Sequence, residues 1–242
     1  MKPGIRSIVE EVRASLALLE DPVRRIGQER YFLGTIQSLG VPLPEVHAIS
    51  RTYHRVLRQW DREDVFTLCE ALFSSGGFEE SIIACHWSRL PVKQYRATDL
   101  KRFADWIHRY VGNWATCDTF CNHTVGSWLM MYPSEIHQLK HWAQHKNRWM
   151  RRASAVSLIV PGSKGFFVQE IEEIALLLLE DADDMVQKGY GWMLKVTYKM
   201  HPKRMEAFVR QHGHRMPRTA LRYAIEKWPE EKRKSVLIQT RR

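Results

Sequence analysis

The sequence predicts an all-α protein. Apolar residues recur at three- and four-residue steps through almost the whole chain, the spacing that places them on one face of a helix. The alternation of apolar and polar residues that marks a half-buried strand is missing, apart from the ambiguous stretch 155–160, so a β-sheet has little sequence to form it. Prolines stand at or near several expected helix starts, where the missing backbone N–H is harmless.

The first expected helix shows the pattern on which the others depend. Over Ser7–Leu19 the apolar side chains of Ile8, Val12 and Leu16 lie one turn apart, and Ser7 with Glu10 has the spacing of a capping box at the start. The same spacing predicts helices over Val23–Ser38, Glu45–Arg58, Glu63–Phe73, Phe78–Ser88, Asp99–Tyr110, Trp114–Met131, Ser134–His145, Trp149–Val160 and Phe166–Leu179. Four more are expected within Asp183–Met200, Pro202–His212, Pro217–Trp228 and Glu230–Ile238.

This number of helices favours a repeat architecture. About a dozen helices, each with one apolar face, cannot all bury that face in one compact bundle, whereas stacked antiparallel pairs can. Repeats of about 40 residues built from such pairs form HEAT-like solenoids with an extended concave face. No linker rich in Pro, Gly or Ser divides the chain, because residues 161–165 are expected to form only a loop. We therefore expect one HEAT-like domain over residues 1–242.

The composition is that of an ordinary globular protein working inside the cell. Of the 242 residues, 44% are hydrophobic and 26% charged, and no run approaches the roughly eighteen apolar residues of a membrane span. The N-terminus lacks the apolar core of a signal peptide. The four cysteines are too few and too unevenly spaced for a secreted disulfide framework. We expect a cytoplasmic monomer with reduced thiols.

The charge of the chain indicates a polyanionic partner. The formal net charge is +10, and residues 199–242 carry 13 Lys and Arg against 4 Glu. A solvated basic tail would explain that excess alone. A second basic cluster lies far from the tail, however, and is interleaved with Trp149; it comprises Lys146, Arg148, Arg151 and Arg152. Two separate basic regions favour phosphate neutralisation on a nucleic acid.

Two tryptophans have spacings that favour a binding site. Trp114 and Asp118 are four residues apart, so on a helix an aromatic plane and a carboxylate share one face and could hold a cation. The alternative is a core tryptophan beside a surface or capping aspartate. Trp192 stands one turn before Lys195, and Gly189 with Gly191 would allow close approach of a neighbour, although a packed tryptophan is again the alternative.

Metal and nucleophile chemistry find little support in the sequence. Cys117-x-x-x-Cys121-x-His123 has no second cysteine pair at zinc-binding spacing, and the stripe of His137, His141 and His145 lacks the glutamate of a His-Glu-x-x-His site. There is no Gly-x-Ser-x-Gly turn and no phosphate-binding glycine loop. We therefore expect no cofactor and no metal.

Three motifs follow one another along the chain. They are Asn113-Trp114-x-x-Cys117-Asp118, Asn147-Arg148-Trp149-Met150-Arg151-Arg152-Ala153 and Lys188-Gly189-Tyr190-Gly191-Trp192-Met193-Leu194-Lys195. An earlier stretch runs from Arg30-Tyr31-Phe32 through Leu39-Gly40-Val41-Pro42-Leu43-Pro44-Glu45. In this order and spacing the motifs resemble those of the AlkD-type DNA alkylation repair glycosylases, from about Arg30 to Trp228.

The resemblance implies a curved stack of HEAT-like repeats that holds duplex DNA on a basic concave face and excises N3- or N7-alkylated purines without flipping the base. Trp114 and Trp192 match the two aromatic walls of the family's cleft, and Asp118 matches its catalytic carboxylate. Arg152 matches a DNA-backbone arginine and Lys195 stands at a further backbone position. Neighbouring Arg148 and Arg151 would also hold phosphates, and Tyr31 matches an N-terminal contact.

The leading hypothesis is a monofunctional DNA glycosylase of base excision repair that leaves an abasic site. An N3- or N7-alkylpurine is already cationic, so its glycosidic bond is weakened and needs no general acid; a carboxylate that stabilises the sugar suffices. The alternative is a non-catalytic helical-repeat protein that binds distorted or branched DNA by shape. A third hypothesis is a scaffold that binds other proteins. Such a protein would show no salt-dependent affinity for DNA.

Overall fold

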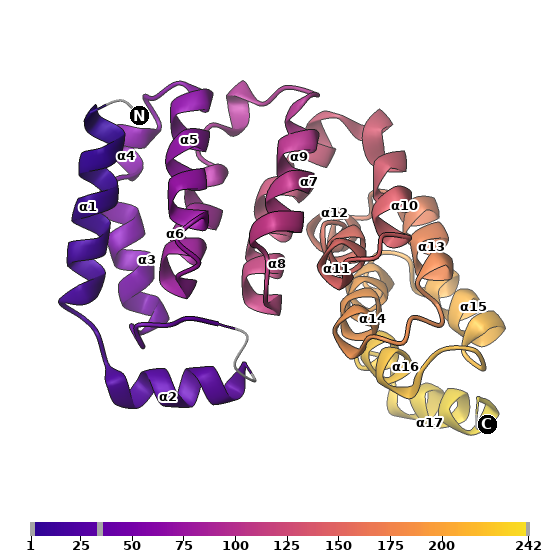
Figure 1. Ribbon diagram of the computed structural model, residues 1–242. Helices are drawn as coiled ribbons and strands as arrows, with labels where there is room; N and C mark the ends of the chain where they lie inside the picture. The colour runs from indigo at the N-terminus through magenta and orange to yellow at the C-terminus, as the bar shows by residue number, and fades with distance from the viewer. Residues whose placement is uncertain (1–2, 33–35, 241–242) are drawn as a thin grey trace. The chain divides into compact units, whose positions relative to one another are not determined.

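The computed structural model confirms an all-α helical-repeat fold (Figure 1). The structure describes residues 3–32 and 36–240, and within these ranges the only extended pairing is an isolated bridge between Gln37 and Gly77. The helices form two compact units, residues 1–128 and 129–242. No described helix is both long and apolar enough to cross a membrane.

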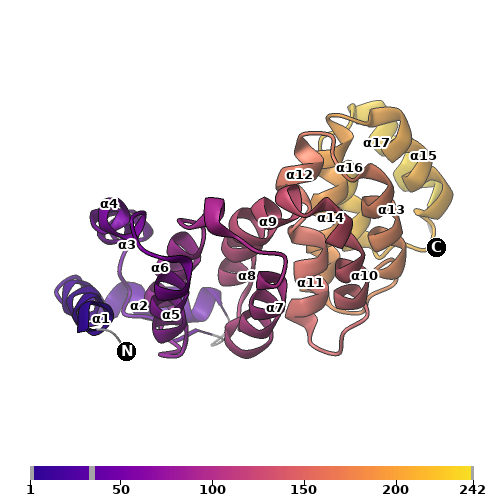
Figure 2. The same ribbon diagram turned by 90° about the horizontal axis from the view of Figure 1, so that it is seen from above.

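The first unit is a two-row stack of helices. Its elements are α1 (Pro3–Ala17), α2 (Pro22–Tyr31), α3 (Leu43–Thr52), α4 (His54–Leu57), α5 (Arg62–Phe73), α6 (Phe78–Ser88), a 3₁₀ turn (Val92–Gln94), α7 (Asp99–Tyr110), α8 (Trp114–Phe120) and a π-helical segment (Cys121–Val125). Helices α1, α5 and α7 pack in one row, and α3, α6 and α8 pack in the other (Figure 2). Each row buries the apolar stripe that the sequence predicts.

Helix α9 (Gly126–Met131) spans the boundary, and the second unit follows the same plan. Its elements are a 3₁₀ turn (Pro133–His137), α10 (Gln138–Ala143), α11 (Arg148–Val156), α12 (Ile159–Ser163), α13 (Val168–Leu177), α14 (Asp184–Tyr198), α15 (Pro202–His212), α16 (Arg218–Ile225) and α17 (Glu230–Gln239). Helix α14 is central to this unit, because it packs against α11, α12, α13, α15 and α16.

Several predicted boundaries were wrong. The helix starting at Pro3 runs through Ser7, whose hydroxyl donates to Glu11 Oε1 at 2.8 Å, so Ser7 and Glu10 form no capping box. Residues 161–163 are helical rather than part of a loop, since a proline early in a short helix loses no internal hydrogen bond. The expected helix 23–38 ends at Tyr31; residues 33–35 lie outside the described residues, and Gln37 pairs with Gly77 instead.

The other differences are interruptions inside long predicted helices. The predicted helix 45–58 is divided between α3 and α4, and 134–145 begins with a 3₁₀ turn. Trp149–Val160 is divided between α11 and α12. The ambiguous stretch 155–160 contains no strand. The expectations of one HEAT-like domain and of a concave basic face stay predictions.

Candidate functional site

The first unit places Trp114 in an aromatic cluster at the start of α8. The Asn113 side chain caps this helix, accepting a hydrogen bond from the Thr116 backbone N–H at 2.9 Å. Trp114 is half-buried. The ring of Phe32 stacks on it with a centroid separation of 5.3 Å, and the ring of Tyr31 meets it edge-on at 6.2 Å. Tyr31 and Trp114, both singled out from the sequence, therefore lie together.

Asp118 lies one turn after Trp114 in the same helix, as the spacing predicted. Its exposed fraction is 8%, so the carboxylate is largely shielded from bulk water. The helix that carries it is fixed by the core, because Phe120 packs edge-on against Phe103 with centroids 5.6 Å apart and Cys117 is fully buried. The packed core thus fixes the helix that carries both Trp114 and Asp118.

The loop before α3 is held by a buried carboxylate that sequence reasoning did not identify. Glu79, in the first turn of α6, is 1% exposed. Its Oε1 accepts from the backbone N–H groups of Leu39, Gly40 and Val41 at 3.1, 3.1 and 3.2 Å. Gly40 has φ of +80°, and a Cβ there would lie 2.1 Å from the Asp21 carbonyl oxygen. The anchoring fixes this loop against α6.

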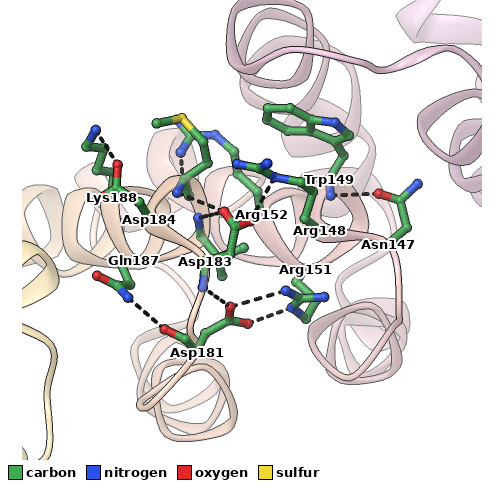
Figure 3. Close-up of polar contacts among 12 residues, drawn as sticks. Asn147, Arg148, Trp149, Arg151, Arg152, Asp181, Asp183, Asp184, Gln187 and Lys188 are labelled. Carbon is green, nitrogen blue, oxygen red and sulfur yellow. Dashed lines mark hydrogen bonds and ion pairs between the residues drawn. The ribbon is translucent and has the colours of Figure 1, made fainter. Parts of the chain in front are cut away.

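The second unit ties the basic motif of α11 to the turn before α14 (Figure 3). Arg148 Nε lies 2.9 Å from Asp183 Oδ2, and its guanidinium stands over the Trp149 ring at 5.0 Å from the centroid. Arg151 binds Asp181 through Nε at 2.6 Å and Nη2 at 3.2 Å. Both arginines are therefore ion-paired in this structure.

Arg152 is the most buried of the sequence-predicted basic residues. Its exposed fraction is 5%, and its Nη1 donates to the carbonyl oxygen of Met185 at the start of α14. Gly189 leaves room for the side chain, since a Cβ at this glycine would lie 3.2 Å from Arg152 Cγ. The close packing of Arg152 against Gly189 brings two of the three sequence motifs into contact within one unit.

Trp192 and Lys195 line a pocket of about 580 Å³ in the second unit. Lys195 Nζ pairs with Glu226 Oε2 at 2.8 Å and stands over the Tyr223 ring at 5.5 Å from its centroid. Lys199 and Lys227 also line this pocket. An aromatic wall with three lysines around it has the composition that favours a phosphate-bearing ligand.

The sequence did not single out several residues of these two sites. Phe32 stacks on Trp114 across more than eighty positions of sequence, and no local spacing encodes that contact. Tyr223 and Lys227 come from α16 and the turn after it, far from Trp192 in sequence. Lys199 falls within the basic tail but was not assigned to a site. The only sequence signal for Lys199 and Lys227 was the excess of basic residues over residues 199–242.

The metal-binding candidates of the sequence do not assemble. Cys117 and Cys121 are fully buried, whereas His123, His137 and His141 are exposed. Among the described residues there is no group of three His, Cys, Asp or Glu side chains placed to hold a metal ion.

Comparison with known proteins identifies the class of this protein. The DNA alkylation repair enzyme family matches residues 12–228, which is most of the chain and includes all three motifs. The protein belongs to this family. A solved structure described as a predicted DNA alkylation repair enzyme from Enterococcus faecalis shares the fold, with a TM-score of 0.78 at 17% identity over 87% of this chain and 97% of that one. Comparison with curated protein sequences gave no significant match.

Proposed function

We propose that this member of the family is a monofunctional DNA glycosylase that removes N3- and N7-alkylated purines from duplex DNA. The observation that carries the proposal is Asp118, a shielded carboxylate one turn from the half-buried Trp114 in a helix fixed by the core. Membership of the DNA alkylation repair family supports the choice of substrate.

The proposed reaction requires the protein to stabilise the positive charge that develops on the sugar. In the proposed reaction the C1′–N bond breaks heterolytically and its electron pair leaves with the cationic base, which becomes neutral. The sugar becomes oxocarbenium-like, and the Asp118 carboxylate stabilises this positive charge while the Trp114 face adds a cation–π contribution. Water then adds to C1′ and loses a proton, which leaves an abasic site.

The lesion need not leave the base stack in this mechanism. The developing positive charge lies on the sugar. A carboxylate that approaches from the backbone side can therefore stabilise this charge without contacting the base. In the second unit we assign Trp192 to an aromatic wall of the site, and Lys195, Arg148 and Arg151 to contacts with the DNA backbone. We assign Arg152 to the DNA backbone as well, and the hydrogen bond from its Nη1 to the Met185 carbonyl oxygen holds the guanidinium against the start of α14.

The proposal is tested by release of N7-methylguanine and N3-methyladenine from methylated duplex DNA. We expect the wild-type protein to release both bases and Asp118→Asn to lose at least about a hundredfold in rate, the usual scale for removing one preorganised electrostatic group. Asp105→Asn is the matched control, since Asp105 is a half-exposed carboxylate that pairs with Arg109 at 3.0 Å on α7.

DNA affinity distinguishes this function from its alternative. An unchanged duplex affinity in Asp118→Asn, together with loss of base release, would support catalysis by the carboxylate. No release of either base by the wild type, with duplex affinity intact, would contradict the glycosylase and favour a non-catalytic protein that binds distorted or branched DNA.

A further inference from the structure

The first unit has a pocket of its own, which is lined by basic side chains. Its volume is about 770 Å³, and it lies between α4, the carboxyl-terminal end of α6 and the segment that follows. Its titratable lining residues include three histidines, two arginines and one lysine: His54, His86, His123, Arg58, Arg89 and Lys93. No carboxylate is among the residues that line it.

This pocket is separate from the aromatic cluster around Trp114. Phe78, which contacts that cluster, begins α6, and His86 lies eight residues further along the same helix. At 1.5 Å rise per residue the two positions are about 12 Å apart along the helix axis. The pocket is therefore not explained by the proposed catalytic residues.

The permanent cations of the pocket lack carboxylate partners, whereas seven of the eleven other arginines in this unit have one. Seven arginines of the unit form ion pairs within 4.0 Å: Arg6, Arg13, Arg24, Arg25, Arg62, Arg102 and Arg109. By contrast, the side chains of Arg58, Arg89 and Lys93 form no ion pair and no hydrogen bond with the residues that the structure describes. Three unpaired positive charges around one pocket repel one another, so an anion between them would be stabilised.

The histidines of the pocket supply neutral hydrogen-bond donors. Burial lowers the pKa of His86 to about 4, with further lowering by His47, His123, His54 and Arg51. Partial desolvation also lowers the pKa values of the half-buried His54 and of the more exposed His123, and the nearby arginines add to the effect. These imidazoles are uncharged near neutral pH, and each keeps one N–H to donate.

The remaining chemistry of the pocket argues against a nucleophile. Cys85 lines it, but burial raises the pKa of this thiol well above its ordinary value. Its sulfur lies 3.7 Å from the Thr116 carbonyl oxygen, to which it donates. A protonated, buried thiol is inert, so the pocket is suited to binding rather than covalent chemistry.

We propose that this pocket binds a phosphomonoester dianion, from either a free nucleotide or the phosphorylated 5′ end of a DNA strand. A phosphomonoester carries nearly two negative charges at neutral pH, whereas a backbone diester carries one. Three permanent cations without carboxylate partners match the larger charge better. The two arginines present planar donor groups that suit phosphate oxygens, and the imidazole N–H groups add neutral hydrogen bonds.

Calorimetric titration of the full chain with 2′-deoxyadenosine 5′-monophosphate, beside the unphosphorylated nucleoside, tests the proposal. We expect the nucleotide to bind at least about tenfold more tightly than the nucleoside. The double variant Arg58→Gln/Arg89→Gln should weaken nucleotide binding by about 10- to 100-fold, since each arginine contributes a charge-assisted hydrogen bond. Arg55→Gln/Arg96→Gln is the matched control, because both of its arginines are exposed and neither lines the pocket.

Two arms of the experiment distinguish the sources of the phosphate. A duplex with 5′-phosphorylated ends that binds more tightly than the same duplex without them, an advantage lost in the double variant, would assign the strand end. An advantage confined to the free nucleotide would assign a small-molecule ligand. Equal wild-type affinity for nucleotide and nucleoside, or an equal loss in the control variant, would overturn the proposal. None of these binding measurements depends on base release. Failure of the glycosylase assay would therefore not affect the test of phosphate binding in this pocket.

Discussion

At the residue scale, Arg151 has a structural role that its place in a basic motif does not reveal. Besides Asp181 it donates to the carbonyl oxygens of His145 and Lys146 at 3.1 and 3.0 Å, so every arm of its guanidinium is bonded. Its side chain is 21% exposed and that of Asp181 is 9% exposed. A shielded, two-point ion pair of this kind fixes the turn before α14.

Asp181→Asn should therefore destabilise the fold. Removing one partner of a shielded pair leaves the other charge uncompensated, which we expect to lower the free energy of unfolding by about 2 kcal/mol. In a chain of this length the loss corresponds to roughly 4–8 °C in Tm, measured by circular dichroism. Asp184→Asn is the control, because its pair with Lys188 is more exposed than that of Asp181 with Arg151 and is expected to contribute less than about 0.5 kcal/mol. An unchanged Tm in Asp181→Asn would refute the structural role of Arg151.

At the element scale, the two glycines of the third motif bring α14 close to its neighbours. A Cβ at Gly191 would lie 2.7 Å from the Ala220 carbonyl oxygen and 2.7 Å from Tyr223 Cβ, both on α16. A Cβ at Gly189 would instead meet the Arg152 side chain at 3.2 Å. The close approach suggested by the sequence is thus confirmed, with α16 on one side and α11 on the other.

The two glycines should respond differently to alanine. Alanine is favoured over glycine inside a helix by about 1 kcal/mol, and this gain should nearly offset the strain at Gly189, where the flexible Arg152 side chain can shift. At Gly191 the clash involves backbone, and overpacking costs about 1–3 kcal/mol. Gly191→Ala should therefore lower the midpoint of urea unfolding more than Gly189→Ala does. Equal midpoints for the two variants would mean that α16 can move away without cost.

Element boundaries were predictable where they depend on local chemistry. The spacing of apolar residues located Phe78–Ser88 and Asp99–Tyr110 with the bounds that the structure has. Trp114–Met131 was expected as one helix, yet residues 121–125 form a π-helical turn. Apolar residues continue at helical spacing through that turn, so a change of backbone hydrogen bonding leaves no trace in the pattern.

The candidate site was predictable to a similar extent. The four-residue spacing of Trp114 and Asp118 correctly placed them one turn apart on one helix. The stacking of Phe32 on Trp114 and the binding of Glu79 to residues 39–41 join segments far apart in sequence, so they depend on tertiary packing that no local spacing encodes. Whether a basic residue is ion-paired, as Arg151 is, also depends on a carboxylate supplied by another element.

At the scale of the whole molecule, positive charge is concentrated in one unit. Residues 1–128 contain 16 Lys and Arg against 15 Asp and Glu, a net charge of +1, whereas residues 129–242 contain 21 against 12, a net charge of +9. Because the second unit carries most of the net positive charge, a polyanion such as DNA is attracted mainly to that unit. The lysines beside Trp192 are the part of that charge which also borders an aromatic pocket.

The salt dependence of duplex binding should therefore depend on which lysines are removed. Each phosphate neutralised adds about 0.9 to the magnitude of the slope of log affinity against log salt concentration. Lys199→Gln/Lys227→Gln, which removes two charges beside Trp192, should reduce that magnitude by about 2, measured by fluorescence anisotropy. Lys203→Gln/Lys234→Gln removes the same charge from α15 and α17, outside that pocket, and should reduce it by less. Equal slopes for the two double variants would show that the second unit attracts DNA through its net charge alone. A smaller slope only for the pocket variant would place backbone phosphates beside Trp192, because counterions are released only where a cation replaces them.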